Sequence, residues 1–300
     1  YTHSIRKLDA QGEVTTVAGS GAAGYNDDFG KKARFNQPSG IAVSKLGMLY
    51  VADTYNHRIR RVEPDGTVHT VSGLSIGFAD GDSAKAKFRY PTGITLGSDG
   101  NLFVADYGNH RVRRVNADGE VITIAGSGAS GGLNGTAANA QFSYPWGIAS
   151  DAAGRIFVVD RSGHRLRMIA GGLVQRVAGV SVGYVDGNAS VARFYYPSAL
   201  ALAPSGTLYM ADDALGRVRR VRMTTGACHI GGVCITTGSR NPLSACQSCQ
   251  SKKAVKAWSA AATGAFCDDE SACTQGDMCK ANGCVGGTEK LCDDNNKCTL

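Results

Sequence analysis

The sequence predicts an all-β protein in which residues 1–226 form a β-propeller, and two observations support this. One text recurs four times, starting at Phe35, Phe88, Phe142 and Phe194, so that the copies follow each other every 52 to 54 residues. Each copy holds short apolar runs separated by turn residues, a pattern typical of strands. A single four-stranded meander cannot bury both of its faces. Copies stacked around an axis would cover one another.

The strands follow from the punctuation of each copy. In the first copy the apolar runs cover residues 40–43, 48–52, 58–62 and 68–71. Asp-Gly pairs at 65–66, 99–100 and 118–119 predict tight turns, because glycine tolerates positive φ. Longer connectors, such as SGAAGYNDDFGKKAR, join the copies. We expect these connectors to project from one face of the disc, where repeat proteins place binding loops.

The recurring text resembles that of NHL-repeat β-propellers over residues 1–222, through G-x-L-Y-V-A-D-x-x-N-H-R-I-R-R-V and G-x-V-x-T-V-A-G. This resemblance implies four-stranded blades in a closed ring that usually has six. Residues 1–19 align with 55–73 and predict only the last two strands of a blade, and no fourth strand is evident after Val221. We therefore expect the chain to be an internal piece of a longer protein, with earlier blade material missing. No apolar run has the roughly 18 residues of a membrane helix.

Residues 227–300 form a second, cysteine-rich region. It contains all ten cysteines: Cys228, Cys234, Cys246, Cys249, Cys267, Cys273, Cys279, Cys284, Cys292 and Cys298. They predict modules at about 228–266 and 267–291, with another starting at 292. A loop-rich segment with few large apolar residues needs disulfides to hold it together, which indicates an oxidising compartment. The text resembles tandem repeats of extracellular proteins, including algal flagellar-hair (mastigoneme) surface glycoproteins, and this implies an extracellular, cell-surface or ciliary location.

The polar residues of the repeat have a structural and a functional interpretation. At matching positions of the copies the text contains Asp (53, 106, 160, 212) and His (3, 57, 110, 164), and three copies contain an R-x-R-R strand, which supplies much of the net charge of +7. We interpret the aspartates as acceptors for the histidine rings and the arginines as an exposed strand edge paired with the aspartates. The alternatives are a zinc site in the central channel, as the resemblance to NHL-type lyases implies, and a basic face for RNA.

Several residues outside this polar set are candidates for modification, binding or ligation. Sequons predict N-linked glycan at Asn134 and Asn188. The aromatic residues near the blade entrances are candidate interface residues, although blade packing would use them equally well: Tyr25, Phe78, Tyr144, Trp146, Tyr195 and Tyr196. We expect no cofactor and no metal. Acidic clusters at 268–270 and 293–294 leave Ca²⁺ in the tail as an alternative, and Cys246-x-x-Cys249 suits a disulfide better than zinc.

These features predict a non-enzymatic extracellular scaffold. The propeller would display loops to other proteins, and the cysteine-rich array would serve as a stalk or assembly surface, with further copies of the chain as partners in a filament. We expect no nucleic-acid partner and no membrane insertion of this segment. The alternatives are a propeller lyase or hydrolase with a channel metal, and an RNA-binding NHL domain.

Overall fold

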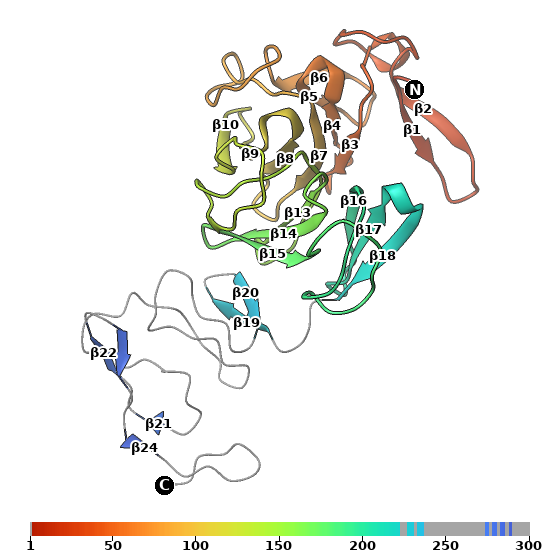
Figure 1. Ribbon diagram of the computed structural model, residues 1–300. Helices are drawn as coiled ribbons and strands as arrows, with labels where there is room; N and C mark the ends of the chain where they lie inside the picture. Colours follow the sequence, from red (N-terminus) through yellow and green to blue (C-terminus); the bar gives the residue numbers. More distant parts are fainter. Residues whose placement is uncertain are drawn as a thin grey trace. The chain divides into compact units, whose positions relative to one another are not determined.

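The computed structural model describes residues 2–222 in full and, beyond them, the backbone of short strands between 227 and 289 (Figure 1). The chain divides into two units, Tyr1–Arg222 and Met223–Leu300. The first unit consists of antiparallel sheets in the four-blade arrangement of a β-propeller, which confirms the predicted fold class. The blades repeat the same strand order, and this repetition sets the positions of the polar and aromatic side chains.

Each blade is a meander in which every strand pairs with the next in sequence. The four blades and the strand pair that precedes them are listed here in chain order. The pair is β1 (Ile5–Leu8) and β2 (Val14–Ala18). Blade 1 consists of β3 (Gly40–Val43), β4 (Leu49–Asp53), β5 (Arg58–Val62) and β6 (Val68–Ser72), and blade 2 of β7 (Pro91–Leu96), β8 (Leu102–Asp106), β9 (Arg111–Val115) and β10 (Val121–Ala125). Blade 3 consists of β12 (Pro145–Ser150), β13 (Ile156–Asp160), β14 (Arg165–Ala170) and β15 (Leu173–Ala178), and blade 4 of β16 (Pro197–Leu202), β17 (Leu208–Asp212) and β18 (Arg217–Val221).

Short elements complete the blades. Single 3-10 turns follow the second strand of blades 1, 2 and 4, at η2 (Thr54–Asn56), η3 (Tyr107–Asn109) and η4 (Asp213–Leu215), and η1 (Gly30–Lys32) lies in the first connector. In blade 3 the connector adds β11 (Gly135–Thr136) to the outer edge of β15. The connectors of blades 1 and 2 also bridge to their own outer strands, through Phe29–Thr67 and Gly81–Val121. The connectors therefore lie against the blades. The sequence had led us to expect connectors that project from one face of the disc.

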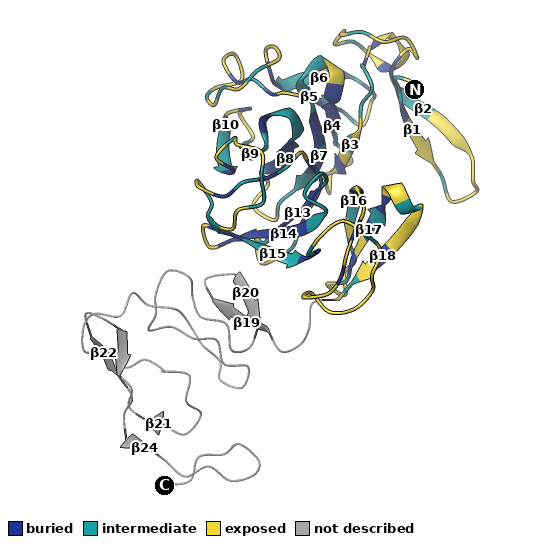
Figure 2. Cartoon of the chain, in the orientation of Figure 1, coloured by how far each residue is buried: buried dark blue, intermediate teal, exposed yellow. Residues whose placement is uncertain are grey.

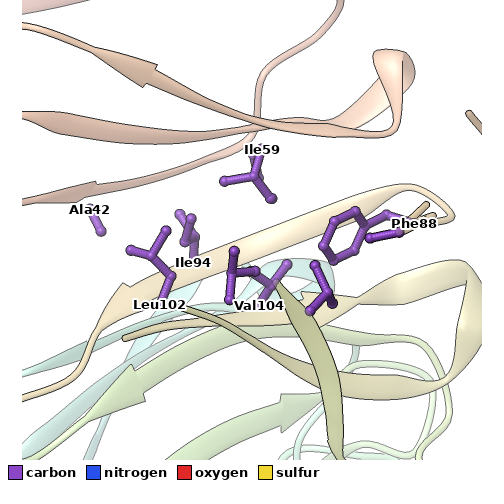
Figure 3. Close-up of a cluster of buried hydrophobic side chains, with 10 residues drawn as sticks. Ala42, Ile59, Phe88, Ile94, Leu102 and Val104 are labelled. Carbon is purple, nitrogen blue, oxygen red and sulfur yellow. The ribbon is translucent and has the colours of Figure 1, made fainter. Parts of the chain in front are cut away.

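The core consists of apolar layers between consecutive blades. Figure 3 shows the layer in which Ala42 and Ile59 of blade 1 meet Ile94, Leu102 and Val104 of blade 2, with Phe88 beside them. Buried residues accordingly follow the inner and middle strands in Figure 2. Such layers bury both faces of a sheet that would be unstable alone.

The blade faces at the two ends of the described unit are exposed where the equivalent faces of inner blades are buried by a neighbouring blade. Val218 of blade 4 has 74% of its surface exposed, whereas Ile59 and Leu166, at the same repeat position, are fully buried. At the other end, Leu8 of β1 is 68% exposed, and the equivalent Val62 is fully buried. Within residues 2–222 no further blade covers these two faces.

The second unit is described only by its backbone hairpins. They are β19 (Ala227–Ile230) with β20 (Val233–Thr236), β22 (Met278–Lys280) with β23 (Gly283–Val285), and β21 (Thr274–Gln275) with β24 (Thr288–Glu289). β19 and β20 form their own sheet, so blade 4 has three strands in the described chain. The predicted disulfides, repeat modules and Ca²⁺ alternative concern side chains outside the described residues. No helix in the described part of the chain is long and apolar enough to cross a membrane.

The apolar layer between blades 1 and 2 leads to a prediction for the stability of the fold. Replacing fully buried Phe88 by alanine should lower the free energy of unfolding by about 3–5 kcal/mol, because the ring fills the layer between blades 1 and 2. Phe29→Ala is the matched control, since that ring lies on the connector and is 58% exposed. Urea unfolding followed by circular dichroism measures both variants. Equal midpoints for the two would contradict this account of the core.

Candidate interaction face

The repeated aspartates are buried acceptors at the end of each second strand. In blade 1 the Asp53 carboxylate accepts hydrogen bonds from Arg60 Nη1 at 2.8 Å, Asn56 Nδ2 at 2.8 Å and the backbone N–H of Asn36 at 2.7 Å. Asp106 repeats the set in blade 2 with Arg113, Asn109 and Arg89. The predicted pairing of aspartate with arginine is therefore confirmed.

The arginines of these pairs lie inside the blades, which corrects the prediction of an exposed edge. The side chain of Arg60 is fully buried, because the connector before β3 folds back over it. Asp27 of that connector accepts a second set of bonds from Arg60, through Nε at 2.9 Å and through Nη2. The guanidinium also lies between the rings of Tyr25 and Phe35, 5.0 Å from each centroid.

The same clamp recurs in two other blades. Arg113 pairs with Asp80 and Asp106, and Arg219 pairs with Asp186 and Asp212. Each guanidinium again lies between a connector ring and a blade phenylalanine. Burial raises the pKa of Asp106 and of Asp160 to about 6, against the opposing effect of the paired arginine. At neutral pH these carboxylates are ionised and held within their ion pairs.

The histidines link neighbouring blades, which corrects the predicted bond to the aspartate. Nδ1 of His57 accepts the backbone N–H of Tyr90 in blade 2 at 3.2 Å, and Nδ1 of His110 accepts that of Tyr144 in blade 3 at 3.2 Å. His3 and His164 do the same toward Gln37 and Tyr196. The aspartate instead receives the amide of the asparagine that precedes His57 or His110. An accepting Nδ1 requires a neutral ring with its proton on Nε2.

The glycosylation candidates lie on connectors and are exposed. Asn188 is on the connector before blade 4, and its Oδ1 accepts the hydroxyl of Ser190 at 2.6 Å. Asn134 occupies the repeat position of Asp27, and its Oδ1 accepts Nη2 of Arg167 at 2.9 Å. Modification at both positions stays a prediction.

The candidate interface residues fall into two groups. Tyr25 and Phe78 cover the arginines of their own blades with one side of the ring and remain about half exposed. The other four lie where the start of each inner strand meets the turn after a second strand. There Tyr144 contacts Tyr107 at 4.8 Å between ring centroids, Trp146 contacts Tyr107 at 5.2 Å, and Tyr195 stacks on Tyr196 at 5.1 Å.

We call this second surface the aromatic face; it comprises Tyr55, Tyr90, Tyr107, Tyr144, Trp146, Tyr195 and Tyr196. Within it, blade 3 departs from the repeat at Trp146, which stands where Ser39, Thr92 and Ser198 stand in the other blades. Arg161 lies at a position that differs in every blade, with Thr54 in blade 1, Tyr107 in blade 2 and Asp213 in blade 4. In blade 1 those small hydroxyls bond each other at 2.6 Å and bond carbonyls of the next inner strand.

Arg161 organises the changed part of the aromatic face. Its guanidinium lies 4.8 Å from the Trp146 ring centroid and 5.8 Å from that of Tyr196, and Nη2 pairs with Asp213 of blade 4 at 2.8 Å. Sequence reasoning missed Arg161 and Asp213. The sequence did contain a signal for them, because Thr54, Tyr107, Arg161 and Asp213 share one repeat position and are four different residue types.

The described residues contain no cluster of three or more His, Cys, Asp or Glu side chains placed to hold a metal ion. The repeated aspartates and histidines are instead engaged in the ion pairs and inter-blade bonds above.

Comparisons with known proteins agree with this geometry. The family model of the NHL repeat matches residues 35–62, 88–115 and 142–167. NHL repeat-containing protein 2 of Bos taurus is 30% identical over 176 residues, 53% of this chain and 24% of that protein. Teneurin-m of Drosophila melanogaster is 28% identical over 253 residues, 73% of this chain and 9% of that protein. The chain thus spans a quarter or less of these two relatives.

A solved structure has the same fold. A structural-genomics protein of unknown function from Bacteroides thetaiotaomicron superposes with a TM-score of 0.59 at 20% identity, over 73% of this chain and 54% of that one. The fold and the matched repeats define the first unit as a β-propeller that contains three NHL repeats. More particularly, its arginine clamps fasten the connectors of blades 1, 2 and 4 to their blades.

The inter-blade histidine bond makes a pH-dependent prediction. Burial, with Arg89 and Arg111 nearby, lowers the pKa of His110 below its usual 6.5. The folded state therefore favours the neutral ring, and the stability contributed by this bond is present above pH 6.5 and is lost as the pH falls through the lowered pKa. His110→Gly removes the ring, and Gly216 shows that glycine suits this backbone. The stability difference from wild type should be greatest near pH 7.5, at about 1 kcal/mol, and should shrink at pH 5.

Urea unfolding at both pH values tests this, with exposed His69→Gln as the control. Asp106 and Asp160 titrate in wild type and variant alike, so their contribution cancels in the difference. A difference that is equal at pH 7.5 and pH 5 would contradict a neutral acceptor.

Proposed function

We propose that this chain is a non-enzymatic scaffold whose aromatic face binds a protein partner and which works outside the cell. The observation that carries the proposal is the Trp146–Arg161 pair, in which Trp146 replaces the small hydroxyl residue of the other blades and Arg161 lies against its ring. The repeated polar groups are used within and between blades, so chemistry on this face depends on residues that differ from the repeat. Large aromatic rings and arginine are the side chains that dominate protein-binding surfaces.

The hydrogen bonds between blades that lie beneath the aromatic face favour binding. Inter-blade bonds from His110 and His164 reach Tyr144 and Tyr196 directly, so the face is ordered before a partner arrives and binding costs less entropy. The similarity to NHL repeat-containing protein 2 and to teneurins is consistent with a propeller used for contact. The ten cysteines after residue 226 support an extracellular location, with the cysteine-rich region as stalk or assembly surface.

The proposed partner contact is tested with a variant in which blade 3 carries the residues of blade 1 on the aromatic face. Trp146→Ser and Arg161→Thr together install the residues of blade 1, so the fold should keep its melting temperature. The full chain, labelled with a photo-crosslinker, is applied to the surface of the cells that make it. Wild type should crosslink discrete proteins, and the double variant should lose at least about 90% of that signal if the face contributes a hot spot.

The control for this experiment is Leu46→Ser, which removes an exposed apolar residue from the β3–β4 turn, at the other end of the strands. It should crosslink like wild type. Equal crosslinking by wild type and the double variant would rule out the aromatic face as the contact surface.

The extracellular proposal has its own test. Intact mass before and after reduction with alkylation counts bridged cysteines, and glycosidase treatment reports glycan. We expect most of the ten cysteines to be bridged. Free thiols and no glycan would overturn the extracellular location without affecting the partner test.

A further inference from the structure

Blade 3 also breaks the repeat at its arginine clamp, away from the aromatic face. At the positions where blade 1 has Tyr25 and Asp27 in the connector and Thr70 in β6, blade 3 has Gly132, Asn134 and Arg176. Blade 2 follows blade 1, with Phe78, Asp80 and Thr123. Blade 3 has therefore lost a ring and a carboxylate and has gained a cation.

The loss leaves Arg167 with half of its usual charge partners. This side chain is fully buried, and its carboxylate partner is Asp160, at 3.3 Å. Asn134 offers an amide oxygen in place of the second carboxylate. Nε of Arg167 is buried without a hydrogen-bond partner, whereas Nε of Arg60 and of Arg113 bonds the connector aspartate. An unpaired buried donor of this kind is costly.

Arg165 has lost its ring. The equivalent Arg58, Arg111 and Arg217 stack on the connector aromatic, 3.8 to 4.1 Å from its centroid. Arg165 instead lies against Gly132, donating from Nη1 to its carbonyl at 3.3 Å, and its Nε has no partner. A Cβ on Gly132 would come within 1.5 Å of Nη1 of Arg165. The guanidinium has thus taken the space of the missing ring.

Arg176 adds a third positive charge to this place. It is paired directly with Arg167 across β14 and β15, where blades 1 and 2 pair the arginine with threonine. Like charges opposite each other destabilise a sheet. The backbone N–H of Thr70 and of Thr123 also bonds the connector aspartate, and blade 3 has no carboxylate there to receive such a bond.

We propose that Arg165, Arg167 and Arg176, the blade-3 arginine cluster, bind a carboxylate from an acidic peptide segment of a partner. The chain itself indicates this chemistry, because three of its four blades place an aspartate carboxylate at this point. Access is through exposed Arg176 and Asn134 and half-buried Arg165, which would donate to the carboxylate, while buried Arg167 contributes charge. The site extends the proposed function to a second surface on the same blade.

The test uses a fluorescein-labelled peptide of alternating Asp and Glu, titrated into the full chain and followed by anisotropy. All proteins carry Thr136→Ala, which removes the sequon and keeps the Asn134 side chain. Asn134→Asp restores the carboxylate of the other blades, and Arg176→Thr restores their threonine. Each should weaken peptide binding about tenfold, since each lowers the net positive charge of the site that the peptide carboxylate would compensate. Asn134→Asp should also raise the melting temperature.

Two controls make the result decisive. Arg220→Thr makes the same substitution at an exposed arginine of blade 4, and it should bind the peptide like the Thr136→Ala parent. Trp146→Ser should also bind normally, which separates this site from the aromatic face. Equal weakening by Arg220→Thr and Arg176→Thr would mean general attraction to a basic surface and would overturn the proposal. Undiminished binding by Asn134→Asp would overturn it as well.

Discussion

The fold depends on one buried ion pair per blade, that of Asp53 with Arg60 and its counterparts. Removing two charges from water is costly unless hydrogen bonds satisfy them, and here nearly every donor and acceptor of the pair is used. The carboxylate ties the start of the inner strand to the second strand, and the guanidinium holds the connector down on its own blade. Breaking such a pair from one side typically costs about 3–5 kcal/mol, because the remaining charge stays buried.

The ion pair acts within a blade, and other groups connect one blade to the next. The apolar layers supply most of the inter-blade free energy, while the histidine bonds and the inner-strand hydroxyls fix how the blades align. Both kinds of polar contact meet at the start of the inner strands, so they support the aromatic face from beneath. A surface that must keep its shape while it binds is well placed there.

The repeat period and the punctuation of each copy were enough to predict the strands, the blades and the pairing of aspartate with arginine. The partner of the histidine was predicted wrongly, because sequence spacing suggests contacts within a copy, and Tyr90 belongs to the next one. The burial of Arg60 was missed for a related reason. A connector reads as a loop, and nothing in its periodicity shows that Asp27 returns to the blade. Arg161 and Asp213 share a repeat position in different blades, so their contact needs the arrangement of the blades in space.

Departures from a repeat carry more information than the repeat itself. A position that is the same in every blade is explained by packing, since every blade must solve the same packing problem. Blade 3 differs at its inner edge, where Trp146 replaces a small hydroxyl residue, and at its connector, where Gly132 and Asn134 replace a ring and a carboxylate. The first change gives up hydroxyl bonds that blades 1 and 2 make, and the second leaves Arg167 under-paired. A chain that retains such losses in one blade and avoids them in its neighbours has a use for that blade beyond holding the ring together.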